Sequence, residues 1–569
     1  MKRMYFFIIL FNFLDANAQL PKLEFAKSFG GKFQDVGSAI AVDLNGNVYT
    51  TGYYTDIADF DPDTSSYKLQ CYGTNDLYVS KMDAFGNFLW AINIKVSIDA
   101  SGYSIETDSQ NNVYVTGRFF GKADFDPGIG QSYLTSNFQH DVFILKLTED
   151  GTYIWAKSIG GDLQESGNAL EIDSKGSIYI TGYFQSTVDF DPNIGIHNIT
   201  AQGESDLFVL KLDANGNLIW VKTIGGFTYI LGLSVKVDAD GNVVMAGAFD
   251  STIDFDPDSG MQIVNSIGGE DVFVLKLDSM GEFVWVKRIG GKYDDRSNSI
   301  ALDTSGNILL TGYFEGKVDF DPGSGLTNLI SLSGEDVFLL KLDRNGNFMF
   351  AKNYGNSNPN SNLVDAGTSI AVDKNNTTYL SGFFSGKVSF KTSLDSFVLQ
   401  STGPSTNIFF LKLDEYGNFI WVYKASGLIS KTVNQIKLDD RGNLYAVGYF
   451  GDTLGLDSRL GGVRLSSNGN SDVFIYKINH AAFSSLKDLR TFETLTYPNP
   501  TSGKINYFVS NSDRSMRIEI YDMSGNLVFN VKDVGTNNLI DLTNQANGIY
   551  IIKLFQNDLL LQYQKILKQ

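Results

Sequence analysis

Runs in which apolar and polar residues alternate recur along most of this 569-residue chain. Alternation with a period of two residues predicts β-strands that bury one face. The runs are joined in pairs by turns that nearly all read Asp-x-x-Gly-Asn, as at 213–217. Glycine at a left-handed position closes a short loop and the aspartate caps it, so each pair of runs predicts an antiparallel hairpin.

One of these hairpins, residues 38–52 in its first copy, occurs seven times. We number the repeats 1 to 7 by the aspartate of the turn. These aspartates are Asp43, Asp108, Asp173, Asp238, Asp303, Asp373 and Asp439. They are 65 residues apart four times, then 70 and 66. A fixed period of this size predicts a protein built from stacked or radially arranged repeats.

Each repeat divides into four predicted strands, named A to D. Strand A is small and apolar (38–42 in repeat 1), and strand B follows the turn (Val48–Tyr54). Strand C has the form Asp-Val-Phe-Val-Leu-Lys-Leu (271–277 in repeat 4), and strand D follows it after a second turn (216–224 in repeat 3). Four antiparallel strands form one sheet, and a sheet repeated around an axis is a propeller blade.

The two ends of the repeat region are out of register with the repeats. Residues 23–31 match strand D although no strand C precedes them, and repeat 7 has a strand C at 472–477 with no strand D after it. A linear array has no use for this arrangement, whereas in a closed ring the first strand completes the last sheet. The sequence therefore predicts an all-β fold, a seven-bladed β-propeller over 19–480 whose N-terminal strand closes the last blade.

The repeat carries a recognisable motif. Gly-Gly-x-x-x-Asp begins at residue 30, and Ile-Ala-Val-Asp and Gly-Asn-Val-Tyr-x-Thr-Gly follow it up to residue 52. The motif resembles the bacterial seven-bladed propeller repeats of the SBBP type, and the resemblance covers 23–477. Three places depart from it: Lys95–Val96 replaces the glycine pair, Phe227–Leu233 replaces the acidic connector, and about five residues are added near 356–363. We expect altered loops there.

A second unit follows a polar linker at 481–494. It opens with Tyr-Pro-Asn-Pro-Thr-Ser-Gly at 497–503 and continues with alternating runs to its end. This pattern predicts a small antiparallel β-sandwich over 495–569. The unit resembles the type A C-terminal sorting domain of the type IX secretion system of Bacteroidetes-like bacteria. The resemblance implies that type IX machinery exports the chain through the outer membrane, usually with removal of this domain.

Residues 1–18 read as a secretory signal peptide. Lys2 and Arg3 form the basic start, 4–14 the apolar run and 16–18 a small-residue cleavage pattern. The apolar run is too short to span a bilayer, and no later run is long enough, so we expect no membrane span. The expected location is outside the cell or on its outer surface.

Charge narrows the classes of partner. The chain has 64 acidic and 45 basic residues, a net charge of −19, and its single cysteine, Cys71, leaves no intrachain disulfide. Nucleic acids and anionic membranes attract basic surfaces, so neither is an expected partner. Divalent cations are compatible with this charge. Without a disulfide, packing must hold the fold.

The loops between strands B and C share the sequence Asp-Phe-Asp-Pro in repeats 1 to 5. Carboxylates two residues apart suit a hard cation, which makes these loops candidate Ca²⁺ sites. The alternative is that phenylalanine anchors the loop while aspartate and proline form a turn. The candidate ligands are Asp59, Asp61, Asp124, Asp126, Asp189, Asp191, Asp254, Asp256, Asp319 and Asp321.

Two other side chains recur at fixed positions. Strand D carries Trp90, Trp155, Trp220, Trp285 and Trp421, and strand C carries Lys81, Lys146, Lys211, Lys276, Lys341, Lys412 and Lys477. An aromatic row can bind sugars, but equivalents in successive repeats favour packing between blades. For the lysines we expect a structural ion pair or an exposed stem.

Catalysis has little support in the sequence. The chain contains three histidines, and no Ser/His/Asp spacing, metal-binding histidine pair or phosphate loop stands out. We therefore predict a non-catalytic binding or adhesion module for an extracellular glycan or protein, with its site on the face of the long B–C loops. The alternatives are a carbohydrate-active lyase or glycosidase that uses acidic residues, and a structural component of the surface layer.

Overall fold

The computed structural model divides the chain into two compact units, Met1–Ala481 and Ala482–Gln569. It describes residues 21–356, 363–391, 396–402, 405–427, 429, 431–479, 494–497, 500–509, 516–522, 526–532, 537–556 and 559–569. The expected signal peptide lies outside the described residues, as does all but the last residue of the expected linker.

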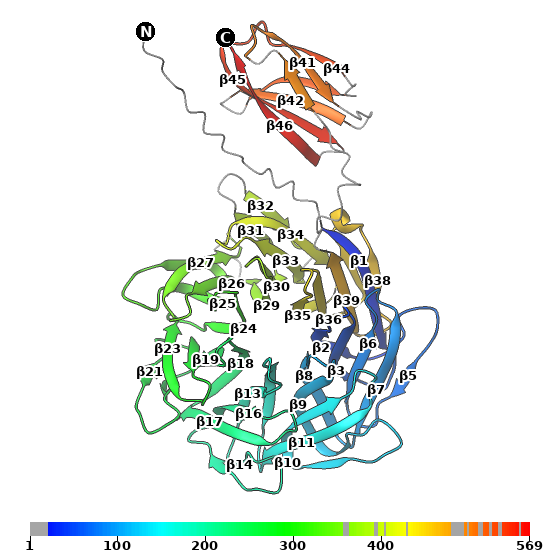
Figure 1. Cartoon of the computed structure of the whole chain (residues 1–569), viewed down its shortest axis with the longest axis vertical. Coiled ribbons are helices and arrows are strands. Elements are labelled where there is room, and N and C mark those ends of the chain that lie inside the picture. The colour runs from blue at the N-terminus through cyan, green and yellow to red at the C-terminus, as the bar shows by residue number, and fades with distance from the viewer. Residues whose placement is uncertain are drawn as a thin grey trace, which may run out of the picture. The chain divides into compact units, whose positions relative to one another are not determined.

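Each repeat forms four antiparallel strands in the order A-B-C-D, and these sheets stand around a common axis with strand A innermost (Figure 1). The A strands are β2 (Asp35–Val42), β8 (Asp99–Thr107), β12 (Ser166–Ile172), β18 (Ile230–Val237), β24 (Arg296–Leu302), β29 (Ala366–Val372) and β35 (Lys431–Leu438). The B strands are β3 (Val48–Tyr54), β9 (Val113–Asp124), β13 (Ile178–Phe184), β19 (Val243–Phe249), β25 (Ile308–Asp319), β30 (Thr378–Phe384) and β36 (Leu444–Phe450).

The outer half of each sheet consists of strands C and D. The C strands are β6 (Asp76–Met82), β10 (Tyr133–Leu147), β16 (Asp206–Leu212), β22 (Asp271–Leu277), β26 (Asn328–Leu342), β33 (Asn407–Leu413) and β39 (Asp472–Asn479). The D strands of repeats 1 to 6 are β7 (Phe88–Val96), β11 (Tyr153–Gly161), β17 (Leu218–Gly226), β23 (Phe283–Ile289), β27 (Phe348–Tyr354) and β34 (Phe419–Ser426).

The fourth strand of repeat 7 comes from the start of the chain. β1 (Lys22–Gly31) pairs antiparallel with β39, from Lys22 opposite Asn479 to Phe29 opposite Val473. The pairing that the sequence predicted between the first and last repeat strands is therefore present.

The A–B and C–D turns have the predicted chemistry. In the first turn Asp43 Oδ1 accepts the backbone N–H groups of Asn45 and Asn47, each at 2.9 Å. Gly46 has a φ of +83°, a conformation that costs little only for glycine. Most other turns repeat this pattern, with Thr148 in place of the aspartate in one turn and Asn111 and Asn376 in place of the glycine in two others. The aspartates of the motif therefore stabilise hairpins.

Short hairpins extend the B–C loops. They are β4 (Ile57–Asp59) with β5 (Lys68–Gln70), β14 (Thr187–Asp189) with β15 (Asn198–Thr200), β20 (Thr252–Asp254) with β21 (Ile263–Asn265), β31 (Lys387–Lys391) with β32 (Ser396–Gln400), and β37 (Thr453–Leu456) with β38 (Arg464–Ser466). In repeats 2 and 5 the long strands β9, β10, β25 and β26 take their place. β28 (Leu363–Val364) and one short 3₁₀ turn, Ser458–Leu460, complete the unit.

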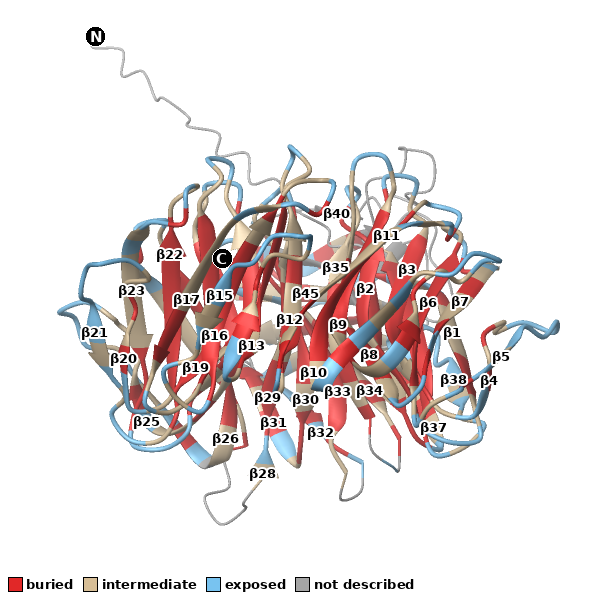
Figure 2. Cartoon of the chain, turned by 90° about the horizontal axis from the view of Figure 1, so that it is seen from below, coloured by how far each residue is buried: buried red, intermediate tan, exposed pale blue. Residues whose placement is uncertain are grey.

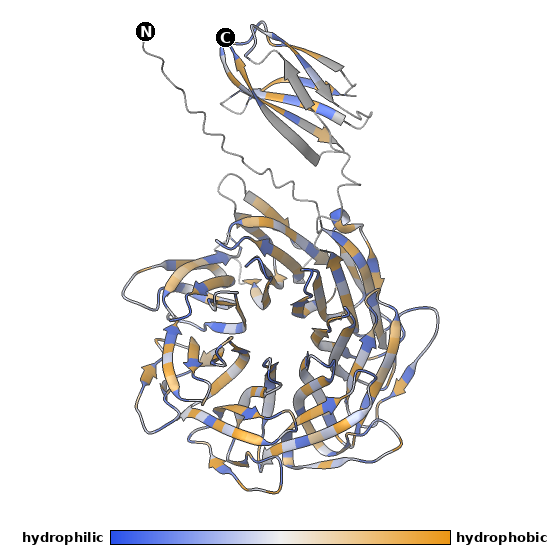
Figure 3. Cartoon of the chain, in the orientation of Figure 1, coloured by the Kyte–Doolittle hydropathy of each residue, from blue (hydrophilic) through white to orange (hydrophobic). Residues whose placement is uncertain are grey.

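The core lies between neighbouring sheets. Strands B and C, such as β13 and β16, are almost continuously buried, and the A strands mix buried with partly buried residues. The turns and much of the B–C loops are exposed (Figure 2). The hydropathy colouring shows apolar and polar residues alternating along the outer strands (Figure 3). Most core clusters combine strands of two adjacent repeats, so the stability of each repeat depends on its neighbours.

Polar contacts near the axis also join successive repeats. The amide of Asn168 donates to Gly232 O of the next repeat at 3.0 Å, and Asn298 donates to Gly367 O at 2.9 Å. The same contact joins repeat 7 to repeat 1, where Asn434 donates to Gly37 O at 2.8 Å. The last repeat is therefore bonded to the first in the same way as neighbours within the chain.

The second unit contains two antiparallel sheets. One consists of β40 (Thr494–Tyr497), β41 (Lys504–Val509) and β44 (Asn537–Asp541). The other consists of β43 (Leu527–Lys532), β42 (Met516–Asp522), β45 (Gly548–Gln556) and β46 (Leu559–Lys568). Ile505 and Ile540 of the first sheet share one buried cluster with Ile518, Ile552 and Ile566 of the second, so the two sheets enclose a common core.

Candidate functional site

The aspartates of the five Asp-Phe-Asp-Pro loops accept hydrogen bonds from their own loops. Asp59 Oδ1 accepts from the N–H of Asp61 at 3.3 Å and from that of Tyr67 at 2.8 Å. Asp61 Oδ1 accepts from the N–H of Asp63 at 3.0 Å. The equivalent bonds are made by Asp124, Asp126, Asp189, Asp191, Asp254, Asp256, Asp319 and Asp321.

The phenylalanine of each loop is fully buried. Phe60 packs edge-on against Tyr54 with ring centroids 5.2 Å apart, and the next four repeats have the same pair at 5.1–5.4 Å. This is the geometry of an anchored turn. The five loops belong to five different repeats, and no group of three or more Asp, Glu, His or Cys side chains suited to a metal occurs among the described residues.

The recurring lysine and tryptophan join adjacent repeats. Lys81 Nζ donates to Glu149 O in the next C–D turn at 3.0 Å, and Trp90 Nε1 donates to the same carbonyl at 3.2 Å. Lys146, Lys211, Lys276, Lys341 and Lys477 make the same lysine contact. These lysines are structural, and the tryptophans pack at the contacts between repeats.

A tyrosine on strand B completes this arrangement in five repeats. The buried ring of Tyr179 lies edge-on to Trp220 with centroids 6.2 Å apart, and Lys211 Nζ lies 4.9 Å from the tyrosine ring centre. The tyrosine hydroxyl donates to the turn aspartate Asp173 at 3.2 Å. The equivalent tyrosines are Tyr49, Tyr114, Tyr379 and Tyr445.

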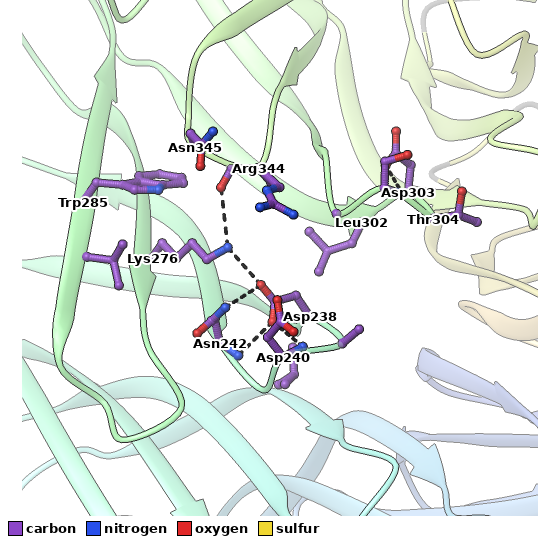
Figure 4. A pocket seen from close by; sticks show the side chains of 15 residues that line it. Asp238, Asp240, Asn242, Lys276, Trp285, Leu302, Asp303, Thr304, Arg344 and Asn345 are labelled. Carbon is purple, nitrogen blue, oxygen red and sulfur yellow. Dashed lines mark hydrogen bonds and ion pairs between the residues drawn. The ribbon is translucent and has the colours of Figure 1, made fainter.

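Repeats 4 and 5 lack this tyrosine, and a cavity lies between them. Val244 and Leu309 occupy its position. A cavity of about 600 Å³ is lined by Lys276 and Trp285 of repeat 4 and by turn residues of both repeats. Because a tyrosine at 244 would place its ring between Lys276, Trp285 and Asp238, its absence accounts for this space. We call it the 4/5 cleft (Figure 4).

Charged groups at the cleft are partly paired. Lys276 Nζ lies 2.9 Å from Asp238 Oδ2 and 3.5 Å from Arg344 O (Figure 4). Burial favours the protonated form of Asp238, yet hydrogen bonds from Lys276 and Asn242 hold its pKa below the ordinary value. The side chains of Asp240, Arg344 and Asn345 at the rim are exposed.

The cleft therefore offers a half-buried indole face beside exposed donors and acceptors. Aromatic rings with a few convergent polar groups are typical of small-molecule sites. Sequence reasoning missed this site, although its signal is visible: the Tyr of the Gly-Asn-Val-Tyr motif is Val244 in repeat 4 and Leu309 in repeat 5. The cleft lies on the face of the tight turns, whereas the sequence suggested the long-loop face.

A second cavity, of about 450 Å³, follows the axis and is lined by strand A residues. Its floor contains the ion pairs Lys236–Glu171 and Lys437–Glu106. Burial favours neutral Lys236, but the charges of Glu171 and Glu106 hold its pKa above the ordinary value. Since these charges are already paired within the protein, the axial cavity is the weaker candidate for a ligand site.

The mouth of the axial cavity contains an aromatic and basic group. Tyr103, Tyr183 and Arg118 line a space of about 400 Å³ there. The Arg118 guanidinium lies 5.7 Å from the Tyr103 ring centre. The asparagines of this rim already donate to backbone carbonyls, as described for Asn168 and Asn434.

One histidine contact resembles part of a catalytic set. His140 Nε2 lies 2.9 Å from Asp99 Oδ1, and both residues belong to repeat 2. Within the described part of the chain, no hydrogen bond joins this pair to a serine, threonine or cysteine nucleophile. The pair therefore provides no nucleophile and base arrangement.

Comparison with known families agrees with both units. Residues 26–61 and 284–313 match the model of a β-propeller repeat. Residues 495–569 match the model of a secretion system C-terminal sorting domain. The chain thus carries β-propeller repeats and a type IX sorting domain. It is exported to the cell surface or beyond.

Curated relatives are distant. An uncharacterised WD repeat-containing protein of Acanthamoeba polyphaga mimivirus is 25% identical over 508 residues, 75% of this chain and 36% of that protein. The regulatory protein FlaEY of Caulobacter vibrioides is 25% identical over 343 residues, 57% of this chain and 33% of that protein. The chain spans about a third of the length of these relatives.

Solved structures are similar only at low scores. The Sqt1 structure from Chaetomium thermophilum has a TM-score of 0.36 at 10% identity, covering 81% of this chain and all of that one. PorZ of Porphyromonas gingivalis, a surface component of the type IX secretion system, has a TM-score of 0.22 at 11% identity, covering 94% and 81%. Among the described residues, no helix meets the length and apolarity needed to cross a membrane.

Proposed function

We propose that residues 19–480 form a seven-bladed β-propeller and that 495–569 form a β-sandwich sorting domain. On this reading, a signal peptide at 1–18 and a linker at 481–494 complete the chain. The four-strand pattern of the repeats and the pairing of β1 with β39 support the closed ring. The shared core of the two C-terminal sheets supports the sandwich.

We propose further that the propeller is a non-catalytic binding module for an extracellular saccharide, and that the 4/5 cleft is its site. The observation that carries this proposal is the replacement of the buried tyrosine by Val244 beside Trp285. Sugar rings stack on aromatic faces through their C–H groups, and their hydroxyls require both donors and acceptors. Trp285 supplies the face, while Asp240, Arg344 and Asn345 supply the polar groups.

The ionisation of the two aspartates that line the cleft, Asp238 and Asp303, favours saccharide binding over glycoside cleavage. A glycosidase needs one carboxyl group that stays protonated near neutral pH as a general acid. Asp238 and Asp303 are both hydrogen-bonded by lysines, Lys276 at 2.9 Å and Lys341 at 2.8 Å. Although burial opposes it, these bonds hold the pKa of Asp303, like that of Asp238, below the ordinary value.

We also infer that the Asp-Phe-Asp-Pro aspartates close their loops and do not bind Ca²⁺. Their oxygens already accept backbone N–H groups at turn distances, as Asp59 does from Tyr67 at 2.8 Å. A cation would have to displace or share these bonds. The five loops then serve as anchored spacers on the long-loop face.

The test of the cleft is a glycan array probed with the full chain and with Val244→Tyr. The new ring fills the cleft as Tyr179 fills the equivalent place in repeat 3, so we expect at least a tenfold loss of affinity for any saccharide bound. Val244→Ile is the matched control, because it keeps the cleft open and should bind as the natural protein does.

Two results would contradict the proposal. The first is binding that Val244→Tyr leaves unchanged while its thermal melt stays cooperative, which would place the saccharide elsewhere. The second is the absence of any saccharide ligand on the array. In that case the axial mouth near Arg118 would be examined next with anionic probes.

A further inference from the structure

Pairs of buried carboxylates lie where successive repeats meet. The first member stands at the start of strand A, and the second stands at the start of strand C of the preceding repeat. Asp35 meets Asp472 at the junction of repeats 7 and 1, Glu165 meets Asp141 at junction 2/3, and Asp365 meets Asp336 at junction 5/6. All six side chains belong to residues that are no more than 3% exposed.

The two carboxylates at junction 7/1 lie beside the same glycine. A Cβ atom added to Gly30 would lie 2.7 Å from Asp35 Oδ2 and 2.8 Å from Asp472 Oδ1. At junction 2/3 a Cβ on Gly160 would lie 2.0 Å from Asp141 Cγ, and at junction 5/6 a Cβ on Gly355 would lie 2.0 Å from Asp336 Cγ. The glycine that opens the repeat motif therefore leaves room for the carboxylate.

Each of these pairs is incompletely satisfied. Asp35 accepts the N–H of Gly31 at 2.5 Å, and Glu165 accepts that of Gly161 at 3.0 Å. Within the described structure, however, no donor reaches Asp472 Oδ1, Glu165 Oε1, Asp336 Oδ1 or Asp365 Oδ2, although all four oxygens are buried. Burying an anion without a partner costs several kcal/mol, so two adjacent carboxylates require a positive charge or a proton.

At two other junctions a basic side chain of the protein lies at or beside the position of the carboxylates. At junction 6/7 the carboxylates are replaced by Lys431 and Asn407, and both are buried. Lys431 Nζ donates to Gly427 O at 3.0 Å, to Ile429 O at 2.9 Å and to Ser405 Oγ at 3.2 Å. A cation bound only by oxygen atoms thus occupies this position of the fold.

Junction 4/5 is intermediate. It keeps two carboxylates, Asp295 and Asp271, but Arg288 Nη1 lies 3.3 Å from Asp271 Oδ2. One basic side chain of the protein therefore offsets this pair. At junctions 7/1, 2/3 and 5/6, no lysine, arginine or histidine within the described residues forms an ion pair with either carboxylate.

We propose that junctions 7/1, 2/3 and 5/6 each bind one Ca²⁺ ion, which takes the place that the Lys431 ammonium has at junction 6/7. Ca²⁺ prefers carboxylate and carbonyl oxygens and tolerates irregular geometry, which suits two carboxylates and nearby backbone. Ions at these positions tie each strand A to the preceding repeat, which stabilises the ring. The alternative occupant is a proton shared by the two carboxyl groups.

Burial of the pairs makes both occupants chemically reasonable. Desolvation raises the pKa of Asp35 to about 7 and that of Glu165 to about 8, with the partner carboxylates Asp472 and Asp141 contributing. Because both carboxylates of each pair are buried, the pair has to be neutralised by a cation or by a proton.

The experiment is equilibrium dialysis of the full, metal-free chain against Ca²⁺ at pH 7.5. We expect three ions bound per chain and a rise in melting temperature with Ca²⁺. No bound calcium would overturn the proposal and leave the shared proton. Binding without a change in melting temperature would also contradict ions held between repeats.

Two double variants exchange the residue pairs of junctions 2/3 and 6/7. Asp141→Asn with Glu165→Lys copies junction 6/7 into junction 2/3, so the stoichiometry should fall to two ions while the metal-free melting temperature does not fall. Asn407→Asp with Lys431→Glu makes the reverse change and should raise it to four. An unchanged stoichiometry in a folded variant would overturn the assignment, since the ions would then lie elsewhere, for example in the Asp-Phe-Asp-Pro loops. If a variant does not fold, the stoichiometry and the calcium-dependent melting temperature of the natural chain decide.

Discussion

Repeats 3 and 4 have nearly the same sheet but different surroundings for their tryptophans. In repeat 3, Tyr179 fills the space beside Trp220 and donates its hydroxyl to Asp173. In repeat 4, Val244 leaves that space open, and Lys276 binds the turn aspartate directly. One side-chain position thus decides whether the same backbone has a solid contact or a cleft. The repeated residues form the common sheet structure, and the replacement of one of them by Val244 opens the 4/5 cleft.

Repeats 3 and 4 can be compared only if contacts with adjacent repeats stabilise each repeat. Removing β1, which completes repeat 7, should have the largest effect on those contacts. Deletion of residues 22–31 leaves repeat 7 with three strands and exposes the edge of β39. We expect loss of the cooperative thermal transition or formation of oligomers, because an open edge pairs with other chains. Light scattering and a thermal melt measure both. A monomer with an unchanged melt would disprove closure by this strand.

Tyr179→Val should convert repeat 3 into a copy of repeat 4. Removing the buried ring creates a cavity and takes the hydroxyl donor from Asp173, so we expect a loss of about 2–4 kcal/mol in unfolding free energy. Denaturant titration measures it. Tyr179→Phe is the control, because it keeps the ring and should cost only about 1 kcal/mol. Equal costs for the two variants would show that the ring does not fill the contact.

Lys276→Met should have the smallest effect. It removes the ion pair with Asp238, for which we expect about 1 kcal/mol at pH 7, since partial exposure screens the charges. The folded-state pKa of Asp238 is lowered, so this contribution is present above the ordinary carboxyl pKa and is lost as the pH falls through the folded value. The difference between variant and natural protein should therefore fade below about pH 4.

Lys211→Met is the matched control for that measurement. Lys211 lies over the Tyr179 ring, and the tyrosine hydroxyl rather than an ammonium donates to Asp173. We expect a weaker pH dependence in repeat 3 than in repeat 4. The same pH profile for both variants would mean that the two lysines have equivalent surroundings.

Much of the fold could be predicted because its signals are local and repeated. The Asp-x-x-Gly-Asn turns specify hairpins, and strand C at 271–277 has the bounds that the structure gives β22. The pairing of β1 with β39 followed from counting strands at both ends. Such inferences need only the sequence period, without knowledge of how side chains pack.

The sites could not be predicted in the same way. The 4/5 cleft exists because repeat 4 has Val244 where repeat 3 has Tyr179. The sequence shows this replacement, but it does not show that the tyrosine ring fills the contact with the next repeat. The junction pairs join residues such as Asp141 and Glu165 that belong to different sheets. The Asp-Phe-Asp-Pro loops show the opposite problem, because the same two aspartates suit a turn and a cation equally well.

The pairing of β1 with β39 also bears on when the protein folds. Phe29 and Val473 are partners in the same sheet although most of the chain separates them. During synthesis the first strand has no partner until the last repeat has been made, and contacts over such sequence distances form slowly. A chain that completes its ring late stays incompletely folded for longer, which suits a protein that is exported to the cell surface or beyond.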